Sequence, residues 1–366
     1  MKKTILFILL LAGLAFLIYL KPFTPEFWSP RAKYERTLWF SDFSNEDIAA
    51  WKTAPAGARK DSLFLELPVN VQIGETGEDI TAWAYHFKLS EGQKLLIELS
   101  ETPDSNLFAD LYFREDNGTY TSEATIRQKA FELPILESGT YLLQMQGLLF
   151  DSLNARVKLR TAPIYDVFPV AGKGNRAIQS LWGAPRDGGR RKHEGIDIFA
   201  KKGTPLLAVC DGEIYRVKEG GLGGKTVWLH DPLLDQSIYY AHLDEQLVEA
   251  GDYVAAGDTI GTVGNTGNAR TTPPHLHLGI YVHGAIDPLL FVRRDRDKAK
   301  PVTRAAEVNT PLTIEEKPAR MYFAPNEISK AKAVLVAGTE VKVIGAADDF
   351  LHIKTNTGRS FFYKKE

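Results

Sequence analysis

Cysteine is almost absent from this sequence of 366 residues, and neither sign of charge is in excess. The single cysteine, Cys210, excludes a disulfide within the chain, so folding must depend on a hydrophobic core. Because Cys210 ends the apolar run 205–210, we expect a buried structural thiol there rather than a nucleophile. Lys and Arg number 44 against 46 for Asp and Glu, which gives a formal net charge of -2. Without an overall basic field, we expect no nucleic-acid partner.

Charge is also missing from residues 4–20, which follow Lys2 and Lys3. This uncharged run reaches the lower limit of the about 17–25 residues with which a helix crosses a bilayer. It ends without a small-x-small cleavage site, so we interpret residues 1–20 as an uncleaved membrane anchor with its two lysines inside. A cleaved signal peptide is the alternative. We therefore expect a protein of the cell envelope, anchored in the cytoplasmic membrane with the rest in the periplasm, or secreted if the segment is cleaved.

Residues 21–162 carry the signals of a linker followed by a β-sandwich module. Ser44 is placed to cap a short helix from residue 45 to about residue 51. Aromatic residues at alternate positions of residues 82–89 indicate a half-buried strand, and His86 within it is expected to be a structural side chain with satisfied hydrogen bonds. Further strands are predicted at residues 94–99, 110–113 and 141–145.

The last part of the chain, residues 303–366, returns to short strands after a charged linker at residues 293–301. Its strand-like runs lie at residues 339–345, 350–355 and 358–363. In the length and spacing of its predicted strands, this segment resembles bacterial SH3-like wall-binding modules. The resemblance implies a small C-terminal SH3-like barrel.

Histidines concentrate in the middle of the chain, where six of the eight lie between His193 and His283. His275 and His277 flank Leu276 in an apolar, β-favouring run. Side chains at positions i and i+2 of a strand project from the same face, so the two imidazoles are expected side by side. Zinc prefers imidazole and carboxylate ligands, with three in a catalytic site and a fourth position left open. The pattern therefore favours a metal site.

A second element of such a site is His193, which precedes Asp197 by four residues. In an extended chain these two side chains share a face and can converge on one ion, whereas Glu194 points the other way and is not expected to be a general base. His283 and Asp287 repeat the spacing at a predicted turn. We expect no function for this second copy, because spacing alone is weak evidence.

Seven segments between about residues 168 and 292 match one family in order and spacing: HEGIDI, GTPLLAVCDGEI, GGKTVWL, YYAHL, VAAGDTIGTVGNTGN, PPHLHLGIY and IDPLLF. This span closely resembles the lysostaphin or LytM-type zinc metalloendopeptidases, peptidase family M23. The resemblance implies a LytM-type antiparallel β peptidase domain at residues 163–297. It implies that one Zn2+ per chain is bound by His193, Asp197 and His277. It also implies that His242 and His275 are catalytic histidines that do not bind the metal.

The loops around this constellation add two expectations. The glycine runs 220–224 and 264–268 indicate tight turns at the rim of a groove, and residues 269–274 are expected to form one wall of it. Neither glycine run has the lysine and helix start of a phosphate-binding loop. Four basic residues precede His193 and either meet acidic groups of a substrate or form a solvated loop: Arg186, Arg190, Arg191 and Lys192.

The expected chemistry is hydrolysis of a peptide bond in peptidoglycan cross-links or stem peptides. Zinc lowers the pKa of its bound water to about 7 and polarises the scissile carbonyl, while the two other histidines help to move protons. The same chemistry on an envelope protein is one alternative, and a non-catalytic envelope scaffold or activator is another. The complete set of five residues argues against the scaffold. Expected partners are peptidoglycan, the membrane through residues 1–20, and an envelope protein. The predicted fold class is mainly β throughout.

Overall fold

The computed structural model describes residues 29–101, 106–294, 298–315, 319–326 and 333–364. This part of the chain is mainly β, as predicted, with few helices. The predicted membrane segment, residues 1–20, lies outside the described residues. Among the residues that are described, no helix is long and apolar enough to cross a membrane.

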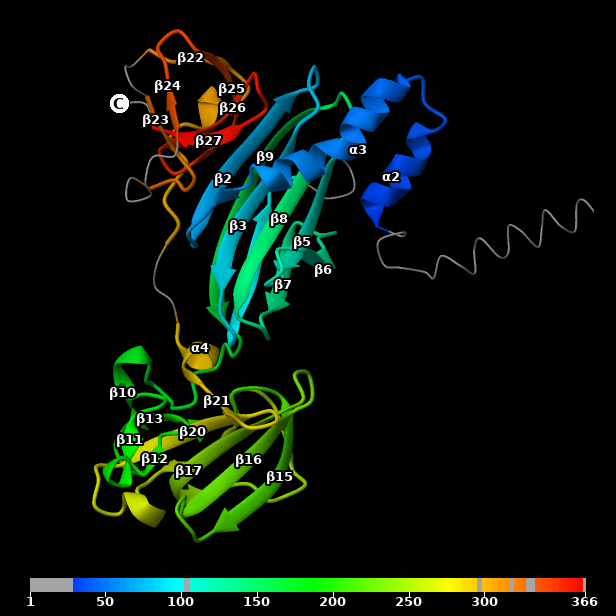
Figure 1. Cartoon of the computed structure of the whole chain (residues 1–366). Coiled ribbons are helices and arrows are strands. Elements are labelled where there is room, and N and C mark those ends of the chain that lie inside the picture. Colours follow the sequence, from blue (N-terminus) through cyan, green and yellow to red (C-terminus); the bar gives the residue numbers. More distant parts are fainter. Residues whose placement is uncertain (1–28, 102–105, 295–297, 316–318, 327–332, 365–366) are drawn as a thin grey trace, which may run out of the picture.

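Two helices precede the first sheet, α2 (Pro30–Leu38) and α3 (Asn45–Lys60). The Ser44 hydroxyl accepts a hydrogen bond from the Asp47 backbone N–H at 3.1 Å, which is the predicted N-cap. The helix runs on to Lys60 rather than ending near residue 51, because the alanine-rich continuation favours helix. Its buried Trp51 donates from Nε1 to the Gly147 carbonyl at 2.9 Å and so fastens α3 to the sheet that it crosses (Figure 1).

The first half of the chain forms two facing β-layers around one core. One layer has the strand order β1-β3-β8-β5-β6, and β2, β9, β4 and β7 adjoin in that order in the other. The bounds are β1 (Leu63–Phe64), β2 (Val69–Thr76), β3 (Ala82–Leu89), β4 (Gln93–Leu99), β5 (Leu107–Arg114), β6 (Tyr120–Thr125), β7 (Ala130–Pro134), β8 (Gly139–Gly147) and β9 (Ser152–Pro163). The predicted strands at residues 82–89, 94–99, 110–113 and 141–145 are therefore confirmed.

His86 on β3 is a structural side chain, as expected. Its Nδ1 lies 2.9 Å from the Ser62 hydroxyl, and its Nε2 lies 2.8 Å from the Tyr120 hydroxyl. Both ring nitrogens therefore have partners within the protein, and neither is available to a ligand.

The C-terminal strands continue the second layer instead of standing apart from it. They are β22 (Pro311–Thr313), β23 (Ala319–Tyr322), β24 (Ala333–Leu335), β25 (Glu340–Ala347), β26 (Phe350–Thr355) and β27 (Ser360–Tyr363). Strand β25 pairs antiparallel with β2, with Val71 opposite Ala347, so the sheet extends to ten strands (Figure 1). The buried Trp83 donates from Nε1 to the Ile344 carbonyl at 2.8 Å. The likeness to an SH3-like barrel stays a prediction.

In the sequence between β9 and β22 comes a separate antiparallel assembly, the central sheet, with the strand order β10-β13-β20-β17-β16-β15-β18. Strand β14 pairs with β19, β19 also pairs with β17, β21 pairs with β20, and β11 and β12 form a hairpin of their own. The bounds are β10 (Ile178–Ser180), β11 (Pro185–Arg186), β12 (Arg191–Lys192), β13 (Ile196–Phe199), β14 (Pro205–Leu207), β15 (Gly212–Glu219), β16 (Lys225–Asp231), β17 (Gln236–Gln246), β18 (Tyr253–Val254), β19 (Thr259–Val263), β20 (His275–Tyr281) and β21 (Ala285–Ile286). Short helical turns are η2 (Asn175–Ala177), η3 (Asp187–Gly189), η4 (Gly267–Ala269), α4 (Leu289–Val292) and η5 (Ala305–Glu307).

Alternation along β20 separates a core face from a functional face of the central sheet. Leu276, Leu278 and Ile280 are fully buried in the core beneath the sheet. The intervening His275 and His277 therefore project from the other face, as the sequence predicts. The Cys210 thiol is partly buried near this core, and burial raises its pKa, which suits a structural role.

Candidate metal centre

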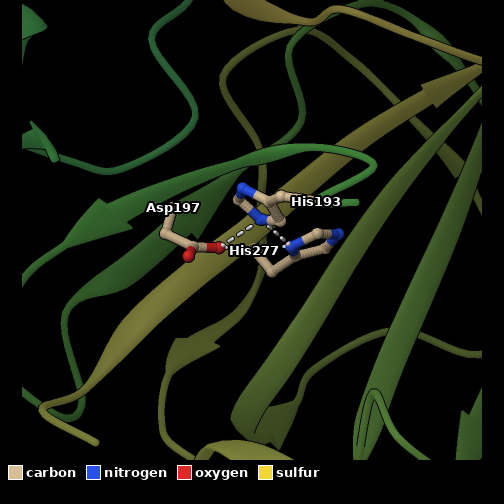
Figure 2. A group of neighbouring side chains, drawn as sticks. All are labelled: His193, Asp197 and His277. Atoms are coloured by element: carbon tan, nitrogen blue, oxygen red, sulfur yellow. Dashed lines mark hydrogen bonds and ion pairs between the residues drawn. The ribbon is translucent and has the colours of Figure 1, made fainter. Parts of the chain in front are cut away.

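Three side chains from two strands and a loop converge on one point above the central sheet (Figure 2). His193 Nε2 lies 2.9 Å from His277 Nδ1 and 3.0 Å from Asp197 Oδ1, and the last two atoms are 3.2 Å apart. His193 and Asp197 are buried, and the side chain of His277 is 15% exposed. The group is therefore largely shielded from solvent, and His277 is its most exposed member.

These distances fit a divalent ion with tetrahedral ligands. Zinc binds imidazole nitrogen and carboxylate oxygen at about 2.0–2.1 Å, which separates the ligands of a tetrahedral ion by roughly 3.3–3.4 Å. The three separations of 2.9, 3.0 and 3.2 Å fall just short of that edge length. Small outward movements of the side chains would admit the ion, and three protein ligands leave one position for water.

The pairing of β13 with β20 brings two of the three candidate ligands, Asp197 and His277, together. In the register of β13 and β20, Asp197 stands directly opposite His277. His193 comes from the loop before β13, where its N–H donates to the Ala184 carbonyl at 2.8 Å. Gly195 makes the close approach possible, because a Cβ there would lie 2.5 Å from the Leu278 carbonyl oxygen and 2.6 Å from the His277 ring.

Outer contacts orient the candidate ligands. His193 Nδ1 lies 2.9 Å from the Leu181 carbonyl, so this nitrogen carries the proton and Nε2 presents its lone pair to the centre. Arg186 donates from one guanidinium nitrogen to Asp197 Oδ2 at 2.7 Å and to the Ser180 hydroxyl at 2.7 Å. One oxygen of Asp197 is thereby held by the arginine, and the other faces the histidines.

The charge state of Asp197 follows from the same contacts. Burial alone would raise the pKa of this carboxyl, but the adjacent imidazoles of His193 and His277 outweigh it and hold the pKa well below its usual range. Burial also lowers the pKa of His277, despite the opposing bond to Asp197. An ionised carboxylate is the form in which Asp197 would bind a metal ion.

Two further histidines flank the three, each fixed by a carbonyl group. His242 Nδ1 lies 2.9 Å from the Thr266 carbonyl, and His275 Nδ1 lies 2.8 Å from the Pro273 carbonyl. Their ring centroids are 5.1 Å apart. His275 Nε2 approaches Asp197 Oδ1 to 3.9 Å, which places it beside the candidate metal position without making it one of the three ligands.

His242 reaches this position because β17 departs from regular alternation. Its neighbours Tyr240 and Leu243 are both fully buried in the core, so one extra residue separates them on the strand. The pairing with β16 shifts register here, and His242 has a φ of 65°, in the left-handed region. Such a bulge re-aims a side chain at a modest backbone cost. Burial lowers the pKa of His242 to about 4.

All five predicted residues line one cleft of about 510 Å³. Leu222 and Gly223, from the first predicted glycine turn, also line it, and so do Ala269 and Thr272 from the predicted wall. The second copy of the spacing behaves differently. His283 and Asp287 are exposed and line no part of this cleft, so they are a coincidence of sequence, as expected.

Sequence reasoning did not identify two residues that shape the centre. Arg186 was considered only for contact with substrate or solvent, yet it binds Asp197, because the β11–β12 hairpin folds back beside β13. Gly195 lies within the HEGIDI segment, but its packing against His277 depends on the β13–β20 register. A glycine between two candidate ligands is the signal that could have pointed to it.

A buried two-histidine, one-carboxylate centre with two further histidines on an antiparallel sheet defines a metallohydrolase-type site. Residues 191–288 match the model of Peptidase family M23. The chain therefore contains a peptidase domain of family M23, a family of metallo-endopeptidases, and the resemblance inferred from the sequence is confirmed.

Known relatives match over this same domain. The L-Ala--D-Glu endopeptidase of Bacillus subtilis is 36% identical over 122 residues, 31% of this chain and 37% of the relative. The peptidoglycan DD-endopeptidase ShyC of Vibrio cholerae is 37% identical over 103 residues, 27% of this chain and 22% of the relative. A solved structure of the lysostaphin catalytic domain from Staphylococcus simulans is 34% identical, with 31% of this chain and 89% of that chain covered and a TM-score of 0.29. These two curated relatives are thus matched over less than half of their own length.

Proposed function

We propose that this chain is a zinc-dependent endopeptidase that hydrolyses a peptide bond in peptidoglycan cross-links or stem peptides. The observation that carries this proposal is the convergence in one cleft of a complete ligand set with two further imidazoles. Two relatives that share the domain are named for cutting peptide bonds of the kind found in peptidoglycan, which supports the choice of substrate.

One Zn2+ per chain would be held by His193 Nε2, Asp197 Oδ1 and His277 Nδ1. Bound there, zinc would act as a Lewis acid and would lower the pKa of a coordinated water to about 7. Arg186 stabilises the site by holding the second oxygen of Asp197, so that one oxygen remains directed at the ion.

His242 and His275 are proposed to carry the protons. Each imidazole uses Nδ1 toward a backbone carbonyl, which leaves Nε2 as a proton acceptor. An Nε2 atom directed into the cleft would accept a proton from the attacking water and return one to the leaving amine nitrogen. Because burial lowers the pKa of His242 to about 4, this ring is neutral at neutral pH and its Nε2 lone pair is not blocked by a proton.

The flanking segments suit a protein that works at the cell wall. We propose that residues 1–20 anchor the chain in the cytoplasmic membrane, which holds the cleft in the periplasm; if that segment is cleaved, the protein is secreted. Residues 303–366 are proposed to be an SH3-like module for wall binding, after a linker and β-sandwich module at residues 21–162 and the peptidase domain at residues 163–297. An envelope protein is a further candidate partner.

The test uses the full-length chain in detergent, with zinc content and peptide release from purified peptidoglycan as readouts. We expect about one zinc per chain and peptide release by the wild type, and loss of both in His277→Ala. His283→Ala is the matched control, because it removes an exposed histidine outside the cleft and should change neither. Mass spectra of the fragments would identify the bond. Zinc binding without release would refute peptidoglycan as the substrate and favour an envelope protein.

A further inference from the structure

One wall of the cleft is formed by the β11–β12 hairpin, which carries a cluster of basic residues. Of the four basic residues that precede His193, Arg186, Arg191 and Lys192 line the cleft, whereas Arg190 does not. The Arg186 guanidinium binds Asp197 and Ser180. Arg191 and Lys192 form the exposed strand β12, and both line the cleft.

Most other residues that line the cleft carry no charge, such as Leu222, Tyr239, Asn268 and Thr272. Two acidic residues line the cleft, Asp197 and Glu194. Asp197 is paired with Arg186 and directed at the candidate ion, and Glu194 lies toward Tyr281, whose pKa its negative charge helps to raise after burial. Basic charge therefore gathers on the hairpin side, although the whole chain has a net charge of -2.

We propose that the β11–β12 hairpin selects substrates with a free carboxylate close to the scissile bond. This inference rests on the proposed function and specifies its substrate class: acidic peptides rather than neutral, glycine-like ones. The arginine fork matches the two oxygens of a carboxylate, and the adjacent Lys192 adds a mobile ammonium group. Because both side chains are exposed, the expected gain is modest, on the order of tenfold in KM.

The position of the hairpin explains why this contact acts on selection and not on chemistry. Arg191 and Lys192 follow the turn of the hairpin and directly precede His193, and they line the same cleft as the three candidate ligands. They are nevertheless outside the three-residue ligand group and outside the histidine pair. Replacement of their charges should therefore weaken substrate binding while leaving metal binding intact.

The test compares two synthetic peptides that span the bond cut in peptidoglycan and differ in one group. In one peptide the carboxylate nearest to the scissile bond is free, and in the other it is a carboxamide. For the full-length wild type we expect the amide to raise KM about tenfold with little change in kcat. In the double variant Arg191→Gln, Lys192→Gln the two KM values should become equal, with zinc content unchanged.

Arg190→Gln is the matched control, because it removes a charge from the same hairpin outside the cleft lining. It should retain the full preference for the free carboxylate. Equal KM values for the two peptides with the wild type would refute the inference, and so would a preference that survives in the double variant. If the double variant raises KM for both peptides by the same factor relative to the wild type, the two residues act on binding in general and the inference is also refuted. If the wild type cuts neither peptide nor peptidoglycan, the proposed function itself fails.

Discussion

Replacement of Gly195 by alanine should disable the metal centre without touching a ligand. A Cβ at this position would lie 2.5 Å from the Leu278 carbonyl oxygen, and 2.6 and 2.8 Å from Cε1 and Nε2 of His277. Real Cβ contacts do not fall below 3.0 Å, so either strand or ring must retreat. The Leu278 carbonyl belongs to β20, which is paired with β13 on one side and β17 on the other. The more easily displaced group is therefore the His277 ring.

The size of the effect follows from these contacts. Overpacking of a well-packed site costs about 1–3 kcal/mol of stability. Misplacement of the His277 ring by a fraction of an ångström takes one of three ligands out of position. Changes around metal ligands reduce metal affinity or activity by roughly 10–100-fold, and displacement of a reacting group has effects of about 100-fold. We therefore expect Gly195→Ala to fold, to bind zinc 10–100-fold more weakly, and to lose about 100-fold in kcat/KM.

Competition with a fluorescent zinc chelator measures the affinity, and thermal unfolding of the zinc-free protein measures the stability separately. The control is Gly284→Ala, because a Cβ at Gly284 would meet nothing within 4 Å and its φ is not in the left-handed region. This variant should match the wild type in both assays. Zinc affinity of Gly195→Ala equal to that of the wild type would refute the role assigned to this close packing.

Three further predictions address single side chains. His275→Ala should retain zinc and lose hydrolysis, whereas His277→Ala should lose both, because only His277 belongs to the candidate ligand group; equal zinc loss in the two variants would contradict the assignment. In the zinc-free protein, NMR titration of labelled histidines should give His242 a midpoint near 4, because burial disfavours its charged form, and a midpoint near the ordinary 6.5 would argue against that burial. Burial also raises the pKa of Glu75 from 4.5 to about 8, so the folded state holds a proton that the unfolded state releases. Stability is then greatest below pH 4.5 with respect to this group and falls as pH rises to about 8, and Glu75→Gln should flatten that slope in thermal melts at pH 5 and pH 8.

Local periodicity predicts the parts of the site that depend on one strand. The alternation in β20 correctly places His275 and His277 on the same face, because a strand has a fixed period of two. The same alternation does not predict the position of His242. Regular alternation would put it on the same side as the buried Tyr240, and only the bulge in β17 turns it toward the cleft.

Contacts between distant segments carry no comparable signal in the sequence. The partner of Asp197 is Arg186, one of three arginines in the hairpin, and nothing in the sequence singles it out as the one that binds Asp197. The pairing of β2 with β25 likewise has no signal within either strand. It is accompanied by contacts between the two layers, such as the one between the Tyr85 hydroxyl on β3 and His352 Nδ1 on β26 at 2.8 Å. The helix α3 also continues past Pro55, which is buried together with Trp51, so its length depends on packing against the sheet as well as on its own residues.

The junction of β2 and β25 also sets an order of events during synthesis. The Trp83 indole donates its hydrogen bond to the Ile344 carbonyl, which lies 261 residues further along the chain and is therefore synthesised much later. The peptidase domain is made in between, and its prior folding would draw the two ends together and shorten the loop that the sheet has to close. A chain that stops before β25 would keep a hydrogen-bonding edge of β2 uncovered, and such an edge pairs readily with other chains. Strand β25, far along the chain, thus completes a layer that β2 begins, and without β25 that layer would have an open edge.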